Sequence, residues 1–576
     1  MKRRTFLLST GIAASSIATG AGFWRWQEIT SKVIYPGREI GHLLPGRLLH
    51  DMKPSQWPAP SAEYKTDVAI VGSGVAGLTA AWRLAREGHA RFALIMGPEP
   101  HGNAASSSAL IGGERLRYPT GAHYLPLPSL ESMHVRTMLA DFGVLTDGAS
   151  SATPTYDERA IVHAPDERLY RDGRWQDGLV PIPEATAAPT TARAIASSRV
   201  KREQAPSGSA VDRFFRTIDG LREARGTDGR KVFAIPIVQS SADPQWTALD
   251  AISFSAWLAR EGYDDPVLRW YLDYCCRDDY GANAAQVSAW AGLHYFSARN
   301  GQATNADRGA VLTWPEGLDS LATRLDAAAF APRSDAPAPL RLEGTALSMR
   351  DTHEGVEVLC ARFEGNRLST FVVRARRAIS AMPLFVAKHV VASLKTDGYD
   401  PAQHAPQVAP WLVANFVMNR HPEEAAGAEL AWDNVLYGSE GLGYVVSTHQ
   451  EIRVAPSRST VFTAYRALAD SMTTGTPDDA RRWMDRASPD EIGALASQEL
   501  REVYGWRFAP CVDRVEITLR GHAMASPTPG TLTNAGLRKL RDADGPILYA
   551  HADLSGYSVF EEAAWWGWRA AERVLG

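Results

Sequence analysis

Residues 67–88 contain the pattern that most restricts how this chain can fold. The segment "DVAIV" is a short apolar run typical of a buried parallel strand, and "GSGVAG" follows it directly. In "LTAAWRLAREG" the apolar residues recur at helical spacing up to Gly88, a typical helix stop. A glycine turn between a strand and a helix lets backbone N–H groups approach a phosphate. The order therefore predicts a Rossmann-like unit that binds a dinucleotide.

The three glycines of the predicted phosphate loop have separate structural roles. Gly72 permits the tight turn, Gly74 lets the backbone approach a pyrophosphate, and Gly77 lets the helix pack close to the sheet. Ser73 and Ala76 complete the loop. We predict that all five residues contact the cofactor.

The ribose end of this site lacks its usual acid. An acidic residue is expected near Ile95, after "RFALIM", but Ile95, Met96 and Gly97 offer no carboxylate. Glu99 follows a few residues later and is the candidate that would reach back to the ribose hydroxyls. We expect the loss to weaken cofactor binding by roughly 1–3 kcal/mol without abolishing it.

Composition narrows the class of protein. The 576 residues suggest two to four lobes, and 61 basic against 65 acidic residues give a net charge of −4. That balance argues against a broad nucleic-acid surface. No Cys or His spacing indicates a metal site. The four cysteines are predicted to be buried thiols: Cys275, Cys276, Cys360 and Cys511.

The N-terminal residues, "MKRRTFLLSTGIAASSIATGAGF", resemble a twin-arginine export signal. Arg3 and Arg4 precede an apolar, Ala/Gly-rich run that reaches Phe23. The alternative is a chance basic start before a short apolar helix. We predict that residues 1–30 direct the chain to the periplasm as a folded protein. Retention of the segment as a membrane anchor is left open.

The segment 545–575 contains a second cofactor element. "ILYAHAD" reads as a buried strand that ends on an acid, "SGYS" as a turn, and "VFEEAAWWGWRAAERVL" as a helix. This order resembles the C-terminal motif of the flavin-dependent amine oxidase and phytoene desaturase superfamily. The resemblance implies an FAD whose ribityl chain meets Asp553. It also implies that the helix starting near Val559 points its N-terminus at the flavin pyrimidine.

Further segments resemble the same superfamily in the same order. "PHGNAASSSALIGGERLRYPTGAHYLPLP", 100–128, is similar to its loop beside the isoalloxazine, which implies cofactor contacts from four residues of this chain: Gly102, Asn103, Gly121 and Ala122. "TWPEGLDSLATRLDA" is similar to a helix lead-in. In 340–360 an alternating pattern predicts a hairpin, where Ala346 matches the backbone position that meets the adenine. "ARRAISAMPLFVAKHVV" resembles the return to the cofactor domain.

These matches predict an α/β protein with two interleaved domains. A Rossmann-like FAD-binding domain would comprise 61–150, 310–395 and 526–576. An α+β substrate domain would be formed by the insertions 151–309 and 396–525.

The candidate substrate and catalytic residues lie in the insertions and beside the flavin. Asp279 and Tyr280 stand beside a glycine turn, and "AWDNVLYGSEGLGY" concentrates three further candidates: Trp432, Asp433 and Tyr444. Carboxylates and aromatic faces suit a protonated amine, although core aromatics and a plain strand pair are the structural alternatives. His123 and Tyr124 of "GAHY", and His551, are the predicted flavin-facing groups.

The resemblance implies hydride transfer to the flavin from a C–H bond beside nitrogen, in an amine or polyamine. Many family members place a lysine near flavin N5, but the matching strand "WLVANFVMNR" has Ala414 or Asn415 there. The electron acceptor, oxygen or another carrier, therefore stays open. The alternatives are a desaturase or isomerase for an apolar substrate, and an exported relative that has lost flavin.

Overall fold

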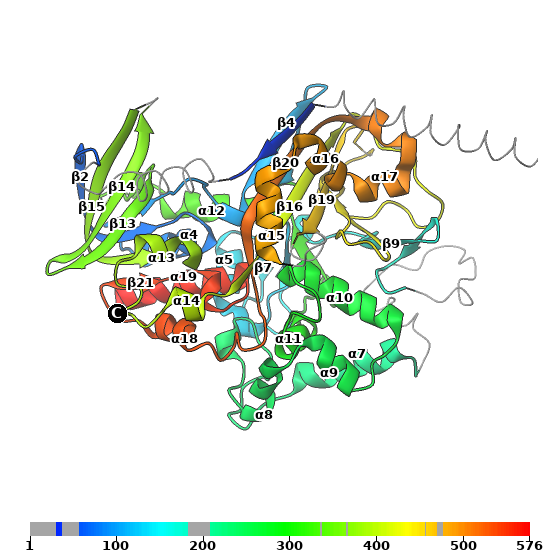
Figure 1. Cartoon of the computed structure of the whole chain (residues 1–576), viewed down its shortest axis with the longest axis horizontal. Coiled ribbons are helices and arrows are strands. Elements are labelled where there is room, and N and C mark those ends of the chain that lie inside the picture. Colours follow the sequence, from blue (N-terminus) through cyan, green and yellow to red (C-terminus); the bar gives the residue numbers. More distant parts are fainter. Residues whose placement is uncertain are drawn as a thin grey trace, which may run out of the picture.

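The computed structural model describes residues 30–36, 57–181, 208–333, 337–364, 367–455, 457–468 and 476–576. Two large sheets organise this part of the chain, one on each side of the molecule (Figure 1). The predicted signal, apart from its last residue, lies outside the described residues. Among the described residues, no helix combines the length and apolar character needed to cross a bilayer.

The first sheet carries the glycine turn. Its strand order is β12-β3-β2-β15-β14-β13, and β21 pairs with β15. β2, β3, β12, β15 and β21 run parallel, while β13 and β14 form the antiparallel hairpin. The bounds are β2 (Ala62–Val71), β3 (Phe92–Ile95), β12 (Leu340–Leu342), β13 (Thr345–Thr352), β14 (Gly355–Glu364), β15 (Arg367–Ser380) and β21 (Ile547–Tyr549).

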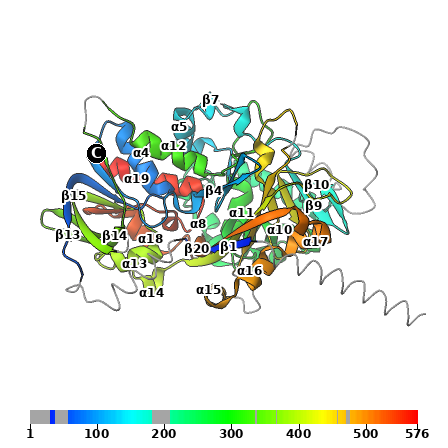
Figure 2. The same ribbon diagram turned by 90° about the horizontal axis from the view of Figure 1, so that it is seen from above.

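Helices pack against this sheet in the manner expected of a Rossmann-like unit. α4 (Val75–Arg86) follows β2, and α12 (Asp319–Ala329) and α19 (Phe560–Leu575) lie beside it (Figure 2). α19 crosses α4 at Gly567, where a Cβ atom would stand 2.1 Å from the Ala76 carbonyl oxygen. No larger residue fits at that crossing, so Gly567 allows α19 to pack in close contact with α4, the helix that follows the glycine turn.

The second sheet is built from other parts of the chain. Its order is β1-β20-β16-β19-β18-β17-β9-β10. The bounds are β1 (Thr30–Ile34), β9 (Glu167–Arg171), β10 (Arg174–Asp177), β16 (Gln407–Met418), β17 (Asp433–Leu436), β18 (Tyr444–Val446), β19 (Thr460–Ala467) and β20 (Val512–Ser526).

Separate helical layers cover the two faces of this second sheet. One core joins it to α7 (Ala210–Glu223), α9 (Phe254–Arg260), α10 (Pro266–Tyr280) and α11 (Ala289–Ala298). The other core joins it to α15 (Pro477–Arg486), α16 (Pro489–Ala496) and α17 (Gln498–Tyr504). Because side chains alternate along a strand, neighbouring residues of β17 and β18 enter different cores.

The α/β class predicted from the sequence is confirmed, and so is the hairpin, whose strands β13 and β14 are antiparallel. Residues 340–342 at its start form a separate strand that pairs in parallel with β3.

Candidate functional site

The glycine turn has three glycines with three different requirements. Gly72 has φ +111°, a region that favours glycine, and a Cβ there would stand 2.8 Å from the Ala381 carbonyl oxygen. At Gly77 a Cβ would meet the Gly72 carbonyl oxygen at 1.9 Å. Gly74 has an ordinary φ of −71°, and a Cβ there meets no described atom within 4 Å. The space beside Gly74 is therefore open.

The start of α4 faces this open space with free backbone donors. Gly74 is its N-cap, and its first turn contains no acidic residue. The first N–H groups of a helix have no partner within it, and they carry the positive end of the helix dipole. The Ser73 hydroxyl donates to the Met96 carbonyl oxygen (2.6 Å), so it ties the loop to the end of β3. This arrangement suits an anionic diphosphate.

Asp553 lies at the same edge of the sheet as the glycine turn. Its Oδ2 accepts a 2.8 Å hydrogen bond from the Leu384 N–H, three residues beyond the Ala381 that touches Gly72. Burial opposes ionisation of Asp553. His551, the Leu384 N–H and His522 outweigh that effect and lower the pKa of this carboxyl. The polypeptide thus places an ionised acid beside the turn, from a segment almost 480 residues later.

His551 acts locally on Asp553. Its Nδ1 accepts a hydrogen bond from the Asp553 N–H (3.1 Å) and lies 3.3 Å from Asp553 Oδ1. A small cavity of about 30 Å³ lies beside Asp553 and the buried Tyr399, room enough for a water. The structure places the imidazole as an orienting group for the acid.

The ribose corner lacks the usual acid, as predicted, and the nearest substitute is engaged elsewhere. Ile95 is fully buried at the end of β3. Both carboxylate oxygens of Glu99 accept from the Arg520 guanidinium, at 2.6 and 2.9 Å. Arg520 comes from β20 of the second sheet, so Glu99 joins the two halves of the molecule.

The loop 100–128 connects the glycine turn to the second sheet. A Cβ at Gly102 would lie 3.6 Å from the Gly74 Cα, and one at Gly121 would meet the Asn103 carbonyl oxygen at 2.1 Å. The Asn103 Nδ2 donates to the Ala523 carbonyl oxygen of β20 (2.6 Å). Ala122, which follows Gly121, is exposed. The predicted isoalloxazine segment therefore starts against the phosphate loop.

Next along this segment is an aromatic group centred on His123, which we call the His123 cage. The imidazole stacks on Tyr465 (ring centroids 4.6 Å apart, planes at 28°) and lies 5.0 Å from Tyr124 and 5.5 Å from Trp432. The Tyr465 hydroxyl donates to the Gly121 carbonyl oxygen (3.0 Å). Burial lowers the pKa of His123 to about 3, so the ring is neutral at physiological pH.

Two adjacent carboxylates at the end of α10 border the His123 cage. Asp279 is buried and forms an ion pair with Arg299, and Arg299 also donates to the Tyr124 hydroxyl (3.2 Å). Asp278 Oδ2 lies 3.4 Å from the same hydroxyl. Burial, with the neighbouring Asp279, raises the pKa of Asp278 to about 7. Asp278 is thus the carboxylate whose charge Arg299 does not neutralise directly.

The structure separates the remaining substrate candidates. Tyr280 is a core residue whose hydroxyl donates to the Ala291 carbonyl oxygen (3.0 Å). Trp432 lies in the His123 cage, and Asp433 follows it at the start of β17. The Tyr444 ring belongs to the other core of the second sheet. It does not join the His123 cage.

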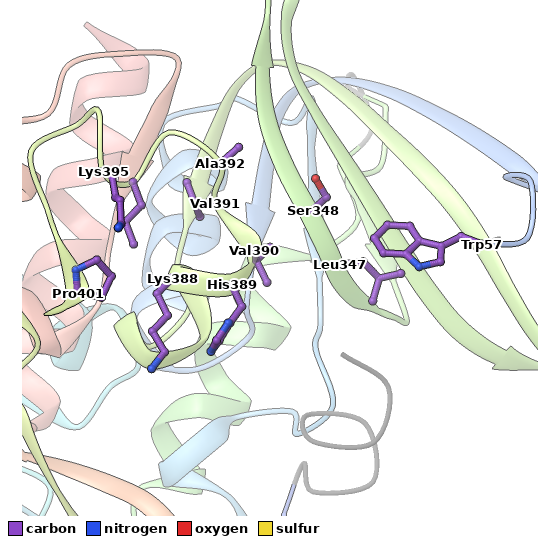
Figure 3. A pocket seen from close by; sticks show the side chains of 11 residues that line it. Trp57, Leu347, Ser348, Lys388, His389, Val390, Val391, Ala392, Lys395 and Pro401 are labelled. Carbon is purple, nitrogen blue, oxygen red and sulfur yellow. The ribbon is translucent and has the colours of Figure 1, made fainter. Parts of the chain in front are cut away.

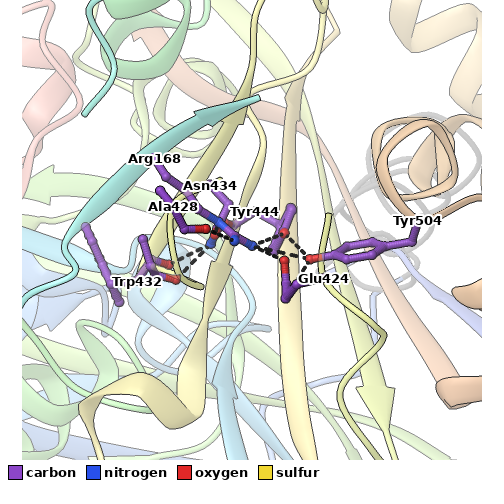
Figure 4. Close-up of polar contacts among 8 residues, drawn as sticks. Arg168, Glu424, Ala428, Trp432, Asn434, Tyr444 and Tyr504 are labelled. Carbon is purple, nitrogen blue, oxygen red and sulfur yellow. Dashed lines mark hydrogen bonds and ion pairs between the residues drawn. The ribbon is translucent and has the colours of Figure 1, made fainter. Parts of the chain in front are cut away.

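Tyr444 instead completes a buried polar group around Arg168, the Arg168 cluster (Figure 4). Arg168 has no exposed surface, pairs with Glu424 (2.9 Å) and lies 3.8 Å over the Trp175 ring. Its guanidinium donates to Asn434 Oδ1 (2.5 Å) and to the hydroxyls of Tyr444 (3.3 Å) and Tyr504 (3.4 Å). Every arm of this cation has a partner, which is typical of a structural ion pair.

Sequence reasoning missed two acids at the start of α19. Val559 is the N-cap, as the predicted helix start requires, and Glu561 and Glu562 follow in the first turn. Both are buried, and burial raises the pKa of each to about 7. Glu562 accepts from the Ile237 N–H (2.6 Å), whereas Glu561 interacts with Arg299 and Asp279. The doublet "EE" after a turn was the available signal.

Two further positions bear on the cofactor. Ala346 is buried in β13, opposite Cys360 of β14. Ala414 and Asn415, the two candidates for the family's lysine position, are both fully buried in β16, and Asn415 is the polar one. Its Oδ1 accepts from the Thr463 hydroxyl (2.8 Å), and its Nδ2 has no partner among the described residues.

A pocket of about 370 Å³ lies beside the C-terminal end of α13 (Leu384–Val390) (Figure 3). The other end of this helix contacts Asp553 through the Leu384 N–H. Trp57 and Leu347 line one side, and Lys388 and His389 the other. No sequence motif pointed to it. In the described part of the chain, no group of three or more His, Cys, Asp or Glu residues is placed to hold a metal ion.

Comparison with known proteins supports the Rossmann-like unit. The model of an NAD(P)-binding Rossmann-like domain matches residues 70–142. No curated protein matches the chain.

Solved structures match over most of the chain. Putrescine oxidase bound to putrescine is 17% identical, with 89% of this chain and 99% of that chain covered and a TM-score of 0.56. Cyclohexylamine oxidase from Brevibacterium oxydans is 17% identical (88% and 98% covered, TM-score 0.55). A fatty acid isomerase from P. acnes that produces CLA is 13% identical (88% and 98%, TM-score 0.53).

The glycine turn and the returning Asp553 thus lie in a chain of the same architecture. This protein shares its fold with putrescine oxidase and cyclohexylamine oxidase, and its residues 70–142 match a Rossmann-like domain.

Proposed function

We propose that the protein binds FAD and oxidises an amine, transferring hydride from the C–H bond beside nitrogen to the flavin. The open space at Gly74, the free N–H groups of α4 and the ionised Asp553 at the same sheet edge fit the diphosphate and ribityl parts of FAD. When bound, the flavin supplies the hydride acceptor. The protein supplies binding, orientation and control of protons.

The observation that carries the amine proposal is Asp278 beside the His123 cage. A half-buried carboxylate that Arg299 does not pair, next to aromatic faces, is a site for a cation. Arg299 neutralises Asp279 and so prevents a second buried negative charge from dominating the site. The solved relatives named as oxidases of putrescine and of cyclohexylamine add support from the fold.

Proton control follows from the same geometry. An amine gives up hydride from its neutral form, so the ammonium must lose a proton in the site. Asp278, with a pKa raised to about 7, can hold the ammonium when ionised and accept a proton near neutral pH. The neutral His123 imidazole adds no repelling charge.

Cofactor binding is tested with Gly74→Glu. The backbone at Gly74 tolerates any residue and no described atom crowds it, so we expect a folded protein with little flavin. Gly220→Glu, on the exposed surface of α7 with equal free space, is the matched control and should keep full flavin absorbance. Full occupancy in Gly74→Glu would refute the site.

Substrate class is tested by anaerobic mixing of the flavin-loaded protein with monoamines, polyamines, amino acids and a fatty acid. Bleaching of the flavin by an amine is the expected result. An oxidised flavin with every amine would refute the amine proposal. Turnover of the fatty acid would favour an isomerase or desaturase, a candidate that the P. acnes isomerase of the same fold supports. Repeating the assay in air reports whether oxygen accepts the electrons.

A further inference from the structure

At one end of the second sheet, several large apolar side chains are exposed to solvent instead of packing in a core. The hairpin of β4 (Ser106–Ile111) and β5 (Glu114–Pro119) turns there, and Leu110 is 60% exposed. Ile452 (70%) and the fully exposed Val454 flank Arg453, which forms an ion pair with Glu114 beside the hairpin turn. We call this surface the sheet-end face. Exposed apolar residues gathered at one place indicate an interaction surface.

Arginines surround these apolar residues. Arg115 faces outward opposite Leu110 in the hairpin. Arg420 lies two residues after the end of β16, and Arg458 two residues before the start of β19, strands whose ends pair through Met418 and Thr460. Both arginines are exposed. Glu114 and Glu451 pair with Arg453, and the other three arginines are exposed on the same face. Apolar side chains beside exposed arginines match the chemistry of a bilayer surface with anionic headgroups.

The N-terminal part of the chain joins the described structure at this same face. β1 runs parallel to β20 with Thr30 opposite Arg514. Arg514 in turn donates to the carbonyl oxygen of Leu110 at 3.1 Å. The first described residue is therefore a neighbour of the exposed hairpin, although the two are 80 residues apart in sequence.

The sequence before Thr30 has the composition of a membrane segment. No charged residue occurs between Phe6 and Phe23, and Lys2, Arg3 and Arg4 precede that run. Trp24 and Trp26 follow it, and tryptophans are enriched at membrane–water interfaces. The residues 24–29 span at most about 20 Å when extended. If residues 6–23 enter a bilayer, Thr30 and its surroundings cannot lie far from the lipid surface.

We propose that the sheet-end face rests on a lipid bilayer, with Leu110, Ile452 and Val454 at the headgroup boundary. Two independent observations meet here: the exposed residues of the folded part, and the point where the apolar segment joins it. The proposal does not depend on which substrate the enzyme oxidises.

The test uses the full chain in vesicles of phosphatidylethanolamine with a minor share of phosphatidylglycerol. The four native cysteines are buried, so a new surface cysteine can be labelled selectively with an environment-sensitive fluorophore. Val454→Cys and Leu110→Cys probe the sheet-end face. Leu575→Cys is the matched control, since Leu575 is an exposed apolar residue (38%) at the far end of α19, away from β4 (Figure 1).

We expect both probes to show blue-shifted emission, quenching by nitroxide lipids and loss of most of their quenching by aqueous iodide, while Leu575→Cys keeps its full iodide quenching. Equal iodide access at all three sites would overturn the proposal. Shielding without lipid quenching would overturn it too, because a second copy or another protein would then cover the face. So would a mature chain that lacks residues 6–23 and stays out of the membrane.

Discussion

The Arg168 cluster and the group formed by Arg299, Asp278, Asp279 and Tyr124 contain the same kinds of side chains, but they differ in their balance of charge. Each has an arginine largely shielded from solvent, a carboxylate partner and a tyrosine hydroxyl that accepts from the guanidinium. Around Arg168 one carboxylate, one amide, one backbone carbonyl and two hydroxyls complete the cation's partners. Around Arg299 there is one carboxylate too many, because Asp278 stands beside the paired Asp279.

Under the proposed function, the surplus acid distinguishes the cation-binding site from the structural one. A closed set of charges stabilises one arrangement and leaves nothing for a ligand. An extra half-buried carboxylate costs free energy in the empty protein, and a bound cation recovers it. This comparison predicts that changes at the two arginine sites have different consequences, from large losses of stability to small changes in affinity.

The largest effect is expected for Arg168→Met. It removes the cation that joins β9 to β17, and it leaves Glu424 without its counter-charge and Asn434 Oδ1 without its donor. We expect this to lower the free energy of unfolding by about 3 kcal/mol. Denaturant titration measures it. Arg486→Met, an exchange in the last turn of the surface helix α15, is the control. A loss below about 1 kcal/mol would mean that the Arg168 cluster is not structural.

Asp278→Asn is expected to do the opposite. It removes a carboxylate that burial disfavours, so stability at neutral pH should stay equal or rise, whereas the affinity for a cationic substrate should fall at least tenfold, about 1.4 kcal/mol. Anaerobic titration of the flavin gives the affinity. An unchanged affinity would show that the ammonium binds elsewhere.

The pH dependence sharpens the same contrast. The pKa of Asp278 is raised in the folded state, so the stability contributed by its protonated form is complete at low pH and is lost as the pH rises through about 7. Cation binding needs the ionised form and should therefore strengthen over that interval. Glu561 and Glu562 titrate in the same range. The informative quantity is thus the difference between the wild-type and Asp278→Asn binding profiles, which should vanish below about pH 5.

The smallest effects are expected for two matched tyrosine substitutions. Tyr444→Phe deletes a hydroxyl from the Arg168 cluster and should cost about 1 kcal/mol of stability with no change in substrate affinity. Tyr124→Phe deletes the hydroxyl between Arg299 and Asp278 and should change affinity by a few-fold, with less effect on stability. Stability and affinity are measured for both proteins. A loss of affinity in Tyr444→Phe together with a loss of stability in Tyr124→Phe would contradict the contrast between the two sites.

Local chemistry made the cofactor end predictable. The strand, glycine turn and helix of 67–88 are neighbours in sequence, so spacing alone indicates their arrangement. Asp553 was accessible to the same reasoning because it follows a short buried strand and precedes a turn and a helix. The strand itself ends at Tyr549, four residues earlier than predicted. The roles of Gly72 and Gly77 follow from the contacts a Cβ would make.

The residues around the proposed substrate site could not be predicted in the same way, because their contacts join segments that are far apart in the sequence. Tyr444 was predicted to face the substrate, but the register of β18 turns its ring into the opposite core. Tyr280 and Asp278 are two residues apart on α10, and only the packing of that helix decides which one reaches Tyr124. Arg168 and Asn434 meet across 266 residues of chain. No periodic pattern in the sequence predicts such a contact.

The contact of Gly567 with Ala76 has a consequence for biosynthesis. One side of α4, the helix that follows the glycine turn, is covered by residues made some 490 positions later on the ribosome. A nascent chain therefore carries an incomplete Rossmann-like unit through most of its translation, and the packing around α4 is complete only after the synthesis of α19.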